Sequence, residues 1–211
     1  MERQQERLGT PRAAGIAGVV FAVLMGVVIV LVRIALPGGA DGHDITVDEA
    51  QRNTVETALG LLPYAGIAFL WFMGALREQA GAAEDRFVST VFLGSGLIFV
   101  ATLFGCAAAA VTVLDENQQN APFGRHYAYT LLTTYSLRMA AVFILTTSTI
   151  GRRLGVMPRP LVFLGFATGL TLLVAGASLP WSELAFPGWA LIVSLDILRG
   201  RRPSATPRPA A

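Results

Sequence analysis

The chain has 211 residues, of which 54% are apolar and 14% are charged, and its formal net charge is +2. Globular proteins carry about 25% charged residues, so a chain this apolar would aggregate in water unless lipid covered its surface. The one cysteine excludes an intramolecular disulfide and a cysteine-cluster metal site. All 16 basic residues are arginine, which excludes enzymes and retinal proteins that depend on a lysine amine.

Six apolar stretches follow one another along the chain. A spanning helix needs about 20 mostly apolar residues, and a helix satisfies its own backbone hydrogen bonds in lipid. The expected spans cover residues 13–36, 57–76, 87–114, 127–150, 160–179 and 180–198. The sequence therefore predicts an all-α, polytopic transmembrane bundle over residues 13–198, with the last two spans in a tight antiparallel hairpin.

The arginines predict how the spans are oriented, because cytoplasmic loops carry an excess of basic residues. Six spans place most of the arginines on one side of the membrane. This group contains Arg3, Arg7, Arg12, Arg77, Arg86, Arg152, Arg153, Arg159, Arg199, Arg201, Arg202 and Arg208. Both termini are therefore predicted to be cytoplasmic, as a tail at 1–12 and a tail at 199–211. The second tail ends in Pro, Ala and Arg, a composition that favours disorder.

Small residues recur at every fourth position in several spans. The first span carries Ala14, Gly18, Ala22 and Gly26, the third Ala101, Gly105 and Ala109, and the fifth Gly165 and Gly169. Such spacing is typical of close helix contacts in membranes. Two questions stay open: whether these contacts lie within one chain or between two chains, and whether the abundance of Ala and Gly alone produces the pattern.

Arg138 lies inside the fourth predicted span, where a charge costs about 2.5–3.5 kcal/mol on insertion scales. It stands 14 residues before Arg152, about 21 Å along a helix. Glu183 stands 16 residues before Arg199, about 24 Å along its own helix. Because the two side chains are expected at similar depths, the sequence predicts an intramembrane pair between Arg138 and Glu183.

Three further residues are secondary candidates for this polar site. Glu56 is the second carboxylate, near the predicted outer boundary, while Thr134 and Tyr135 lie within one turn of Arg138. Three interpretations of Arg138 stay open. It forms a structural pair, it belongs to an anion, headgroup or proton-linked site, or its side chain extends outward to the membrane surface.

Motifs for catalysis and cofactor binding are absent from the sequence. It contains no HExxH, GxSxG, Walker or GxGxxG pattern. Its two histidines, His43 and His126, fall in predicted external loops and not inside the spans, where haem would need them. We therefore predict no enzymatic activity, catalytic residue, cofactor or metal. The basic residues follow the topology, so nucleic acid is not a predicted partner.

Three stretches carry a family resemblance. They are residues 62–77 (LPYAGIAFLWFMGALR), 84–96 (EDRFVSTVFLGSG) and 186–195 (FPGWALIVSL). Together they resemble a family of small, uncharacterised six-span integral membrane proteins of high-G+C Gram-positive bacteria, and the resemblance covers about half of the chain. It implies a bacterial membrane protein and no particular activity. Asp196 stands where the resemblance leads us to expect a less polar or aromatic residue.

Two functions fit these features. The first is a multi-pass protein of the plasma membrane that binds lipid and either a second copy of itself or another membrane protein, as a non-enzymatic interaction or accessory subunit. The alternative is a small transporter or channel with a polar path or anion site near Arg138. A transporter should enclose a wet cavity that reaches Arg138. An interaction protein should pack its polar pair dry and expose a stripe of small or aromatic residues.

Overall fold

The computed structural model of the chain describes residues 2–35, 49–80, 86–115, 121–179 and 181–199, and every regular element in these ranges is helical. In chain order the elements are α1 (Glu2–Ala35), α2 (Glu49–Ala80), α3 (Arg86–Asp115), α4 (Ala121–Thr130), η3 (Leu131–Ser136), α5 (Leu137–Leu154), α6 (Arg159–Ala175), η4 (Gly176–Ser178), η5 (Ser182–Leu184) and α7 (Ala185–Leu198). The helices α4 and α5 and the π-helical turn η3 between them form one continuous rod. The predicted disordered tail, apart from Arg199, lies outside the described residues.

Four helices are long and apolar enough to cross a membrane. These segments are Arg12–Ile34, Glu49–Glu78, Phe87–Val111 and His126–Leu154, and they match the first four predicted spans. The fifth predicted span corresponds to α6, which has 17 residues, and the sixth to α7, which has 14. The prediction of an all-α chain is therefore confirmed for the described residues, and four of their helices could cross a membrane by length and composition.

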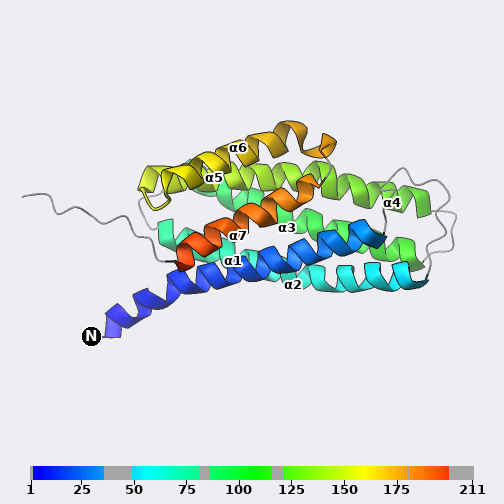
Figure 1. Cartoon of the computed structure of the whole chain (residues 1–211), viewed down its shortest axis with the longest axis horizontal. Coiled ribbons are helices and arrows are strands. Elements are labelled where there is room, and N and C mark those ends of the chain that lie inside the picture. Colours follow the sequence, from blue (N-terminus) through cyan, green and yellow to red (C-terminus); the bar gives the residue numbers. More distant parts are fainter. Residues whose placement is uncertain (1, 36–48, 81–85, 116–120, 180, 200–211) are drawn as a thin grey trace, which may run out of the picture.

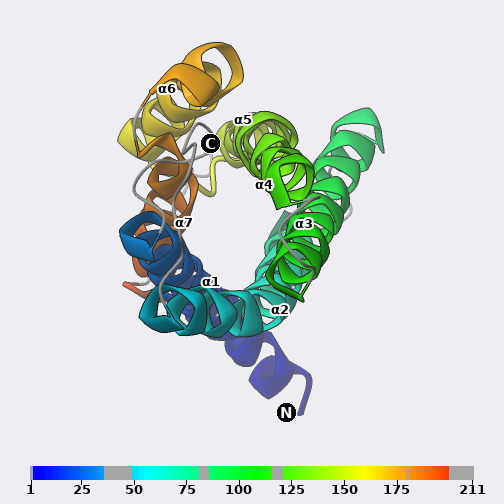
Figure 2. The same ribbon diagram turned by 90° about the vertical axis from the view of Figure 1, so that its right-hand side faces the viewer.

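The helices form a ring in which neighbours along the chain are mostly neighbours in space (Figure 2). α1 packs against α2, α2 against α3, α3 against the rod of α4, η3 and α5, and α5 against α6. α7 completes the ring between α6 and α1, so the first and last helices of the chain lie side by side (Figure 1).

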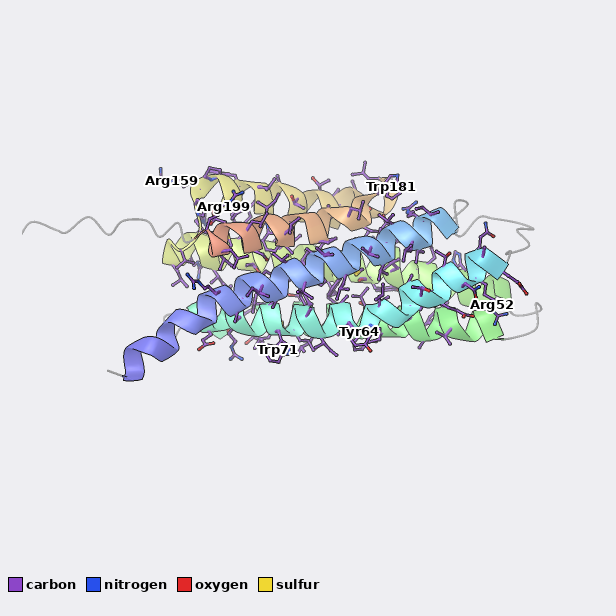
Figure 3. The ribbon with its side chains drawn as sticks, turned by 60° about the horizontal axis from the view of Figure 1, so that its bottom comes forward. Arg52, Tyr64, Trp71, Arg159, Trp181 and Arg199 are labelled. Carbon is purple, nitrogen blue, oxygen red and sulfur yellow. The ribbon has the colours of Figure 1, made fainter. Side chains whose placement is uncertain are left out.

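The two ends of the bundle differ in charge. Figure 3 shows Arg159 and Arg199 at one end, and Arg52 and Trp181 at the other. The last turns of α2 and α5, which carry Arg77, Arg152 and Arg153, also lie at the first end (Figure 1). We call this end the arginine-rich end.

Aromatic side chains fill the middle of the ring. The aromatic core, as we call it, consists of Phe21, Phe69, Phe92, Phe99, Phe143, Phe186 and Trp189, all essentially inaccessible. Ring centroids lie 5.0 Å apart for Phe21 and Phe69 and 4.9 Å apart for Phe99 and Phe186, in tilted or edge-to-face geometry. Such pairs contribute about 0.5–1.5 kcal/mol each beyond their buried area. The core joins α1, α2, α3, α5 and α7 into one packed unit.

Glycines allow α6 to lie close to α5. A Cβ atom on Gly165 would collide with the hydroxyl of Ser148, and one on Gly169 would lie 2.8 Å from Cγ of Leu145. Both glycines are buried. The small residues predicted in the fifth span therefore form a helix contact within the chain.

The stripe on α1 divides into two parts. A Cβ atom on Gly18 would collide with Ser194 of α7 and Phe72 of α2, so this part of the stripe is also an internal contact. Gly26, two turns later, has nothing within 4 Å of such an atom. It lines an apolar surface groove with Ala22 and Val30. The predicted close helix contact is therefore internal at Gly18, whereas Gly26 has no such contact among the described residues.

The last two predicted spans run antiparallel, but they do not pack closely against each other as a hairpin (Figure 1). α6 ends at Ala175 and α7 begins at Ala185, with the short turns η4 and η5 between them. α6 packs mainly against α5, whereas α7 packs mainly against α1. Gly165 and Gly169 let α6 pack closely against α5. Phe186 and Trp189 of α7 pack instead in the aromatic core, so the two helices have different main neighbours.

Candidate functional site

Glu183 is the one buried charged side chain in the part of the chain that the structure describes, with 6% exposure. Its partner is Arg33 in the last turn of α1. Nη2 of Arg33 donates to both carboxylate oxygens, at 2.7 Å and 3.0 Å. A buried carboxylate is costly unless it is paired and hydrogen-bonded, so this contact neutralises the main polar group in the bundle.

Trp181 covers the other side of the same guanidinium. Cζ of Arg33 lies 5.5 Å from the centroid of the Trp181 ring, within the range of a cation–π interaction. Arg33 is 28% exposed, and Trp181 is half exposed at the end of the bundle opposite the arginine-rich end (Figure 3). We call Arg33, Trp181 and Glu183 the Glu183 cluster.

The turn before α7 positions Glu183. Trp181 has a φ of 63°, in the left-handed region that is costly for a residue with a side chain. The hydroxyl of Ser182 donates to the carbonyl of Gly176 at 2.5 Å, and the N–H of Leu184 donates to the carbonyl of Trp181 at 3.0 Å. These bonds fold the chain back tightly enough to place the Glu183 carboxylate against α1.

Arg138 lies elsewhere, and the predicted pair between Arg138 and Glu183 is wrong. The Arg138 side chain is exposed, and its Nη1 donates to the carbonyl of Thr134 on its own helix at 3.2 Å. The inward face of α5 carries Ala140, Phe143 and Ile144, all fully buried. Arg138 is about 160° around the helix from the buried Ala140. Its side chain therefore faces outward, away from the apolar core.

Depth counting misses the true partner of Glu183 because depth does not say which helices are neighbours. Arg33 lies at the outer end of the first predicted span, 13–36, and belongs to the last turn of α1. Because α7 and η5 pack against α1, Arg33 is the cation within reach of Glu183, whereas Arg138 is exposed on α5.

The secondary candidates do not join Glu183. Glu56 accepts a hydrogen bond from Nε of Arg52, one turn earlier on α2, at 3.0 Å, and both side chains are about half exposed. Thr134 is partly buried in η3, and Tyr135 is 55% exposed. Of the predicted site residues, the structure brings together only Arg138 and the backbone of Thr134.

A pocket opens among the helices at the arginine-rich end. Its walls are mostly apolar, with Phe92, Leu161 and Val193 among them, and they also include Arg77 and Asp196. No hydrogen bond or ion pair joins either of these two side chains to another described residue. This pocket presents a cation and an anion beside apolar walls, far from Arg138.

The outward face of α2 is the feature that sequence reasoning missed. Tyr64, Ile67 and Trp71 are 64%, 51% and 71% exposed, and Figure 3 shows Tyr64 and Trp71 pointing away from the bundle. Gly60 and Gly74 lie on the same face, seven residues from Ile67 on either side, with nothing within 4 Å of an added Cβ atom. We call Gly60, Tyr64, Ile67, Trp71 and Gly74 the α2 outer face. The seven-residue spacing of Gly60, Ile67 and Gly74 is present in the sequence, but these residues are uncharged and so are not found by looking for charged side chains.

Metal chemistry has no ready site in this part of the molecule: the described residues contain no group of three His, Cys, Asp or Glu side chains that could hold an ion. Comparisons with family models, curated proteins and solved structures give no match to this chain. The resemblance to a bacterial six-span family therefore stays a prediction.

Proposed function

We propose that this protein is a multi-pass protein of the bacterial plasma membrane that acts by binding another membrane protein, as a non-enzymatic interaction or accessory subunit. The observation that carries the proposal is the contrast between a bundle with a packed aromatic core and a helix face that exposes large aromatic side chains. Exposed aromatic residues are enriched at the energetic centres of protein interfaces.

Six crossings with both termini in the cytoplasm fit the helices best. α6 extends about 26 Å and α7 about 21 Å at 1.5 Å per residue, and the turns η4 and η5 lengthen both toward the membrane surface. The basic side chains at the arginine-rich end agree with a cytoplasmic location for that end. In this topology the α2 outer face points toward the lipid that surrounds the ring.

The alternative of a transporter with a polar path near Arg138 has weaker support. Arg138 faces away from the ring and bonds to its own helix, and the buried Glu183 carboxylate is already neutralised by Arg33. A path through the ring would have to pass the aromatic core, whose centroids are about 5 Å apart. These features favour binding at the outer surface over movement of solute through the middle.

Photocrosslinking in living membranes tests the proposal. A photoreactive amino acid replaces Ile67 on the α2 outer face, and a matched control replaces Phe163 on α6, which is 71% exposed. We expect a discrete protein adduct from position 67 and only lipid adducts from position 163. A folded protein that gives no protein adduct at position 67 contradicts the proposal. A cytoplasmic reporter fused after Ala211 that stays inactive contradicts the topology.

A further inference from the structure

The pocket at the arginine-rich end lies at the level expected for lipid headgroups. Asp196, in its wall, stands 3 residues before Arg199, about 4.5 Å along the helix, and Figure 3 shows Arg199 at this end of the bundle. Arg77, also in its wall, belongs to the last turn of α2. Since basic residues gather at the cytoplasmic boundary of a membrane, a ligand of this pocket is one that reaches that surface.

Two opposite charges line this pocket without meeting. The Arg77 guanidinium and the Asp196 carboxylate form no ion pair with each other or with any other described residue. A ligand that carries both charges gives each of them a counterpart. A purely anionic group is repelled by Asp196, and a purely cationic group is repelled by the arginines of this end. The charges of the pocket therefore favour a zwitterion.

The polar groups of the pocket differ in burial according to their chemistry. Thr147 lines the pocket with 5% exposure, and its hydroxyl donates to the carbonyl of Phe143 at 2.7 Å. Because its hydrogen is used in this way, the Thr147 oxygen acts toward a ligand as an acceptor. Asp196, which is partly buried, is a second acceptor, whereas the donor Arg77 is exposed. A zwitterion is therefore expected to enter with its cation first and to keep its anion outside, beside Arg77.

The volume of the pocket limits which cation can enter. The pocket has about 50 Å³ of free space, and one water-sized group needs about 10–15 Å³ of such space, so about three to five non-hydrogen atoms fit. The walls around this space are mostly apolar, with Phe92, Leu161 and Val193 among them, which suits a short alkyl chain. An ethanolamine group meets both limits. The choline group is larger, and its ammonium carries methyl groups in place of the hydrogens that an acceptor binds.

We infer that this pocket binds a phosphoethanolamine group. The ammonium donates to the Asp196 carboxylate and the Thr147 oxygen, and the guanidinium of Arg77 donates to the phosphate at the mouth of the pocket. The lipid phosphatidylethanolamine and soluble phosphoethanolamine share this group, and the position of the pocket at the membrane surface favours the lipid. This inference rests on the membrane location in the proposed function and does not depend on the α2 outer face.

Lipid binding to the purified full chain tests the inference. Native mass spectrometry from detergent measures the dissociation constants of phosphatidylethanolamine, phosphatidylcholine and phosphatidylglycerol with identical acyl chains. We expect phosphatidylethanolamine to bind about tenfold more tightly than the other two lipids, because one charged hydrogen-bonded contact is worth at least that factor. Phosphatidylcholine lacks the N–H donors, and phosphatidylglycerol lacks the cation.

Variants of the two charges show whether this pocket is the site. Asp196→Asn should weaken phosphatidylethanolamine binding about tenfold and leave phosphatidylglycerol binding equal or tighter, because a repulsive charge is removed. A variant that merely misfolds would not change the preference in this direction. Arg77→Gln should weaken the binding of both phosphates. The matched controls Glu78→Gln and Arg159→Gln remove exposed charges near the same end and should leave the three constants unchanged.

Competition with soluble phosphoethanolamine identifies the source of the ligand. Displacement of the lipid at equal concentration supports the pocket with a soluble ligand, and persistence of the lipid supports it with the membrane as the source. Equal binding of phosphatidylethanolamine and phosphatidylcholine by the parent, or an unchanged preference in Asp196→Asn, overturns the inference. If the preference is absent while position 67 still crosslinks to a membrane protein, only the pocket is rejected. If the preference is present without that adduct, only the proposed interaction function fails.

Discussion

Two arginines that both lie within apolar helices have opposite surroundings. Arg33 ends α1 and is held between a carboxylate at 2.7 Å and an aromatic ring at 5.5 Å. Arg138 lies near the start of α5 and is exposed, and the acceptor it has among the described residues is a carbonyl of its own helix. The comparison shows that the face of the helix, and not depth alone, decides whether a charge in an apolar span has a partner.

Removing the guanidinium of Arg33 should have the largest effect. Arg33→Leu leaves the buried Glu183 carboxylate without a partner, and breaking a buried pair is strongly unfavourable. We expect the free energy of unfolding to fall by roughly 2–4 kcal/mol, the lower part of the usual range because Arg33 keeps some exposure. Unfolding in mixed detergent micelles, followed by circular dichroism, measures this change.

The double variant is the control for that experiment. Arg33→Leu combined with Glu183→Leu removes both charges, and it should recover much of the lost stability because apolar side chains replace the pair. If the two single losses simply add, Arg33 and Glu183 are not coupled, and the distinction from Arg138 disappears.

Trp181 should give an intermediate effect that depends on what replaces it. Trp181→Ala loses the cation–π contact but keeps a side chain in the left-handed region, so we expect a loss of about 0.5–1 kcal/mol. Trp181→Gly loses the same contact and relieves a backbone cost of about 1–2 kcal/mol. The glycine variant should therefore melt above the alanine variant. The reverse order in thermal melts would show that the backbone at Trp181 is not strained.

Arg138 should give the smallest effect. Arg138→Leu removes an exposed charge with one long hydrogen bond to its own helix, and surface substitutions usually change stability by less than about 0.5 kcal/mol. The variant should express and unfold like the parent in the same detergent assay. A loss comparable to that of Arg33→Leu would mean that Arg138 has an essential partner, and the comparison between the two arginines would fail.

The sequence predicts the helices better than it predicts their faces. Apolar runs of span length identify the first four membrane helices because length and hydropathy are local properties. Glu183 forms an ion pair with Arg33 and not with the predicted Arg138, because pairing depends on which helices become neighbours. This contact between α1 and η5 joins residues 150 positions apart.

The small residues of α1 also show that sequence periodicity does not identify the neighbouring helix. Gly18 and Gly26 share one stripe in the sequence, but the first lies against α2 and α7 while the second faces an open groove. Periodicity places residues on a common face and does not say where the neighbouring helix ends. The α2 outer face likewise follows from tertiary packing, because the arrangement of the neighbouring helices leaves Tyr64 and Trp71 on the outside of the ring.

The separation of Arg33 from Glu183 also has a consequence for how the protein is made. At roughly 5–20 residues per second, a ribosome synthesises the carboxylate about 8–30 seconds after the arginine that it neutralises, because 150 residues lie between them. During that interval Arg33 lacks the carboxylate that it binds in the folded chain, and α1 lacks α7 as a neighbour. A nascent chain that stops before its last helix therefore lacks this ion pair, and its α1 has no α7 beside it.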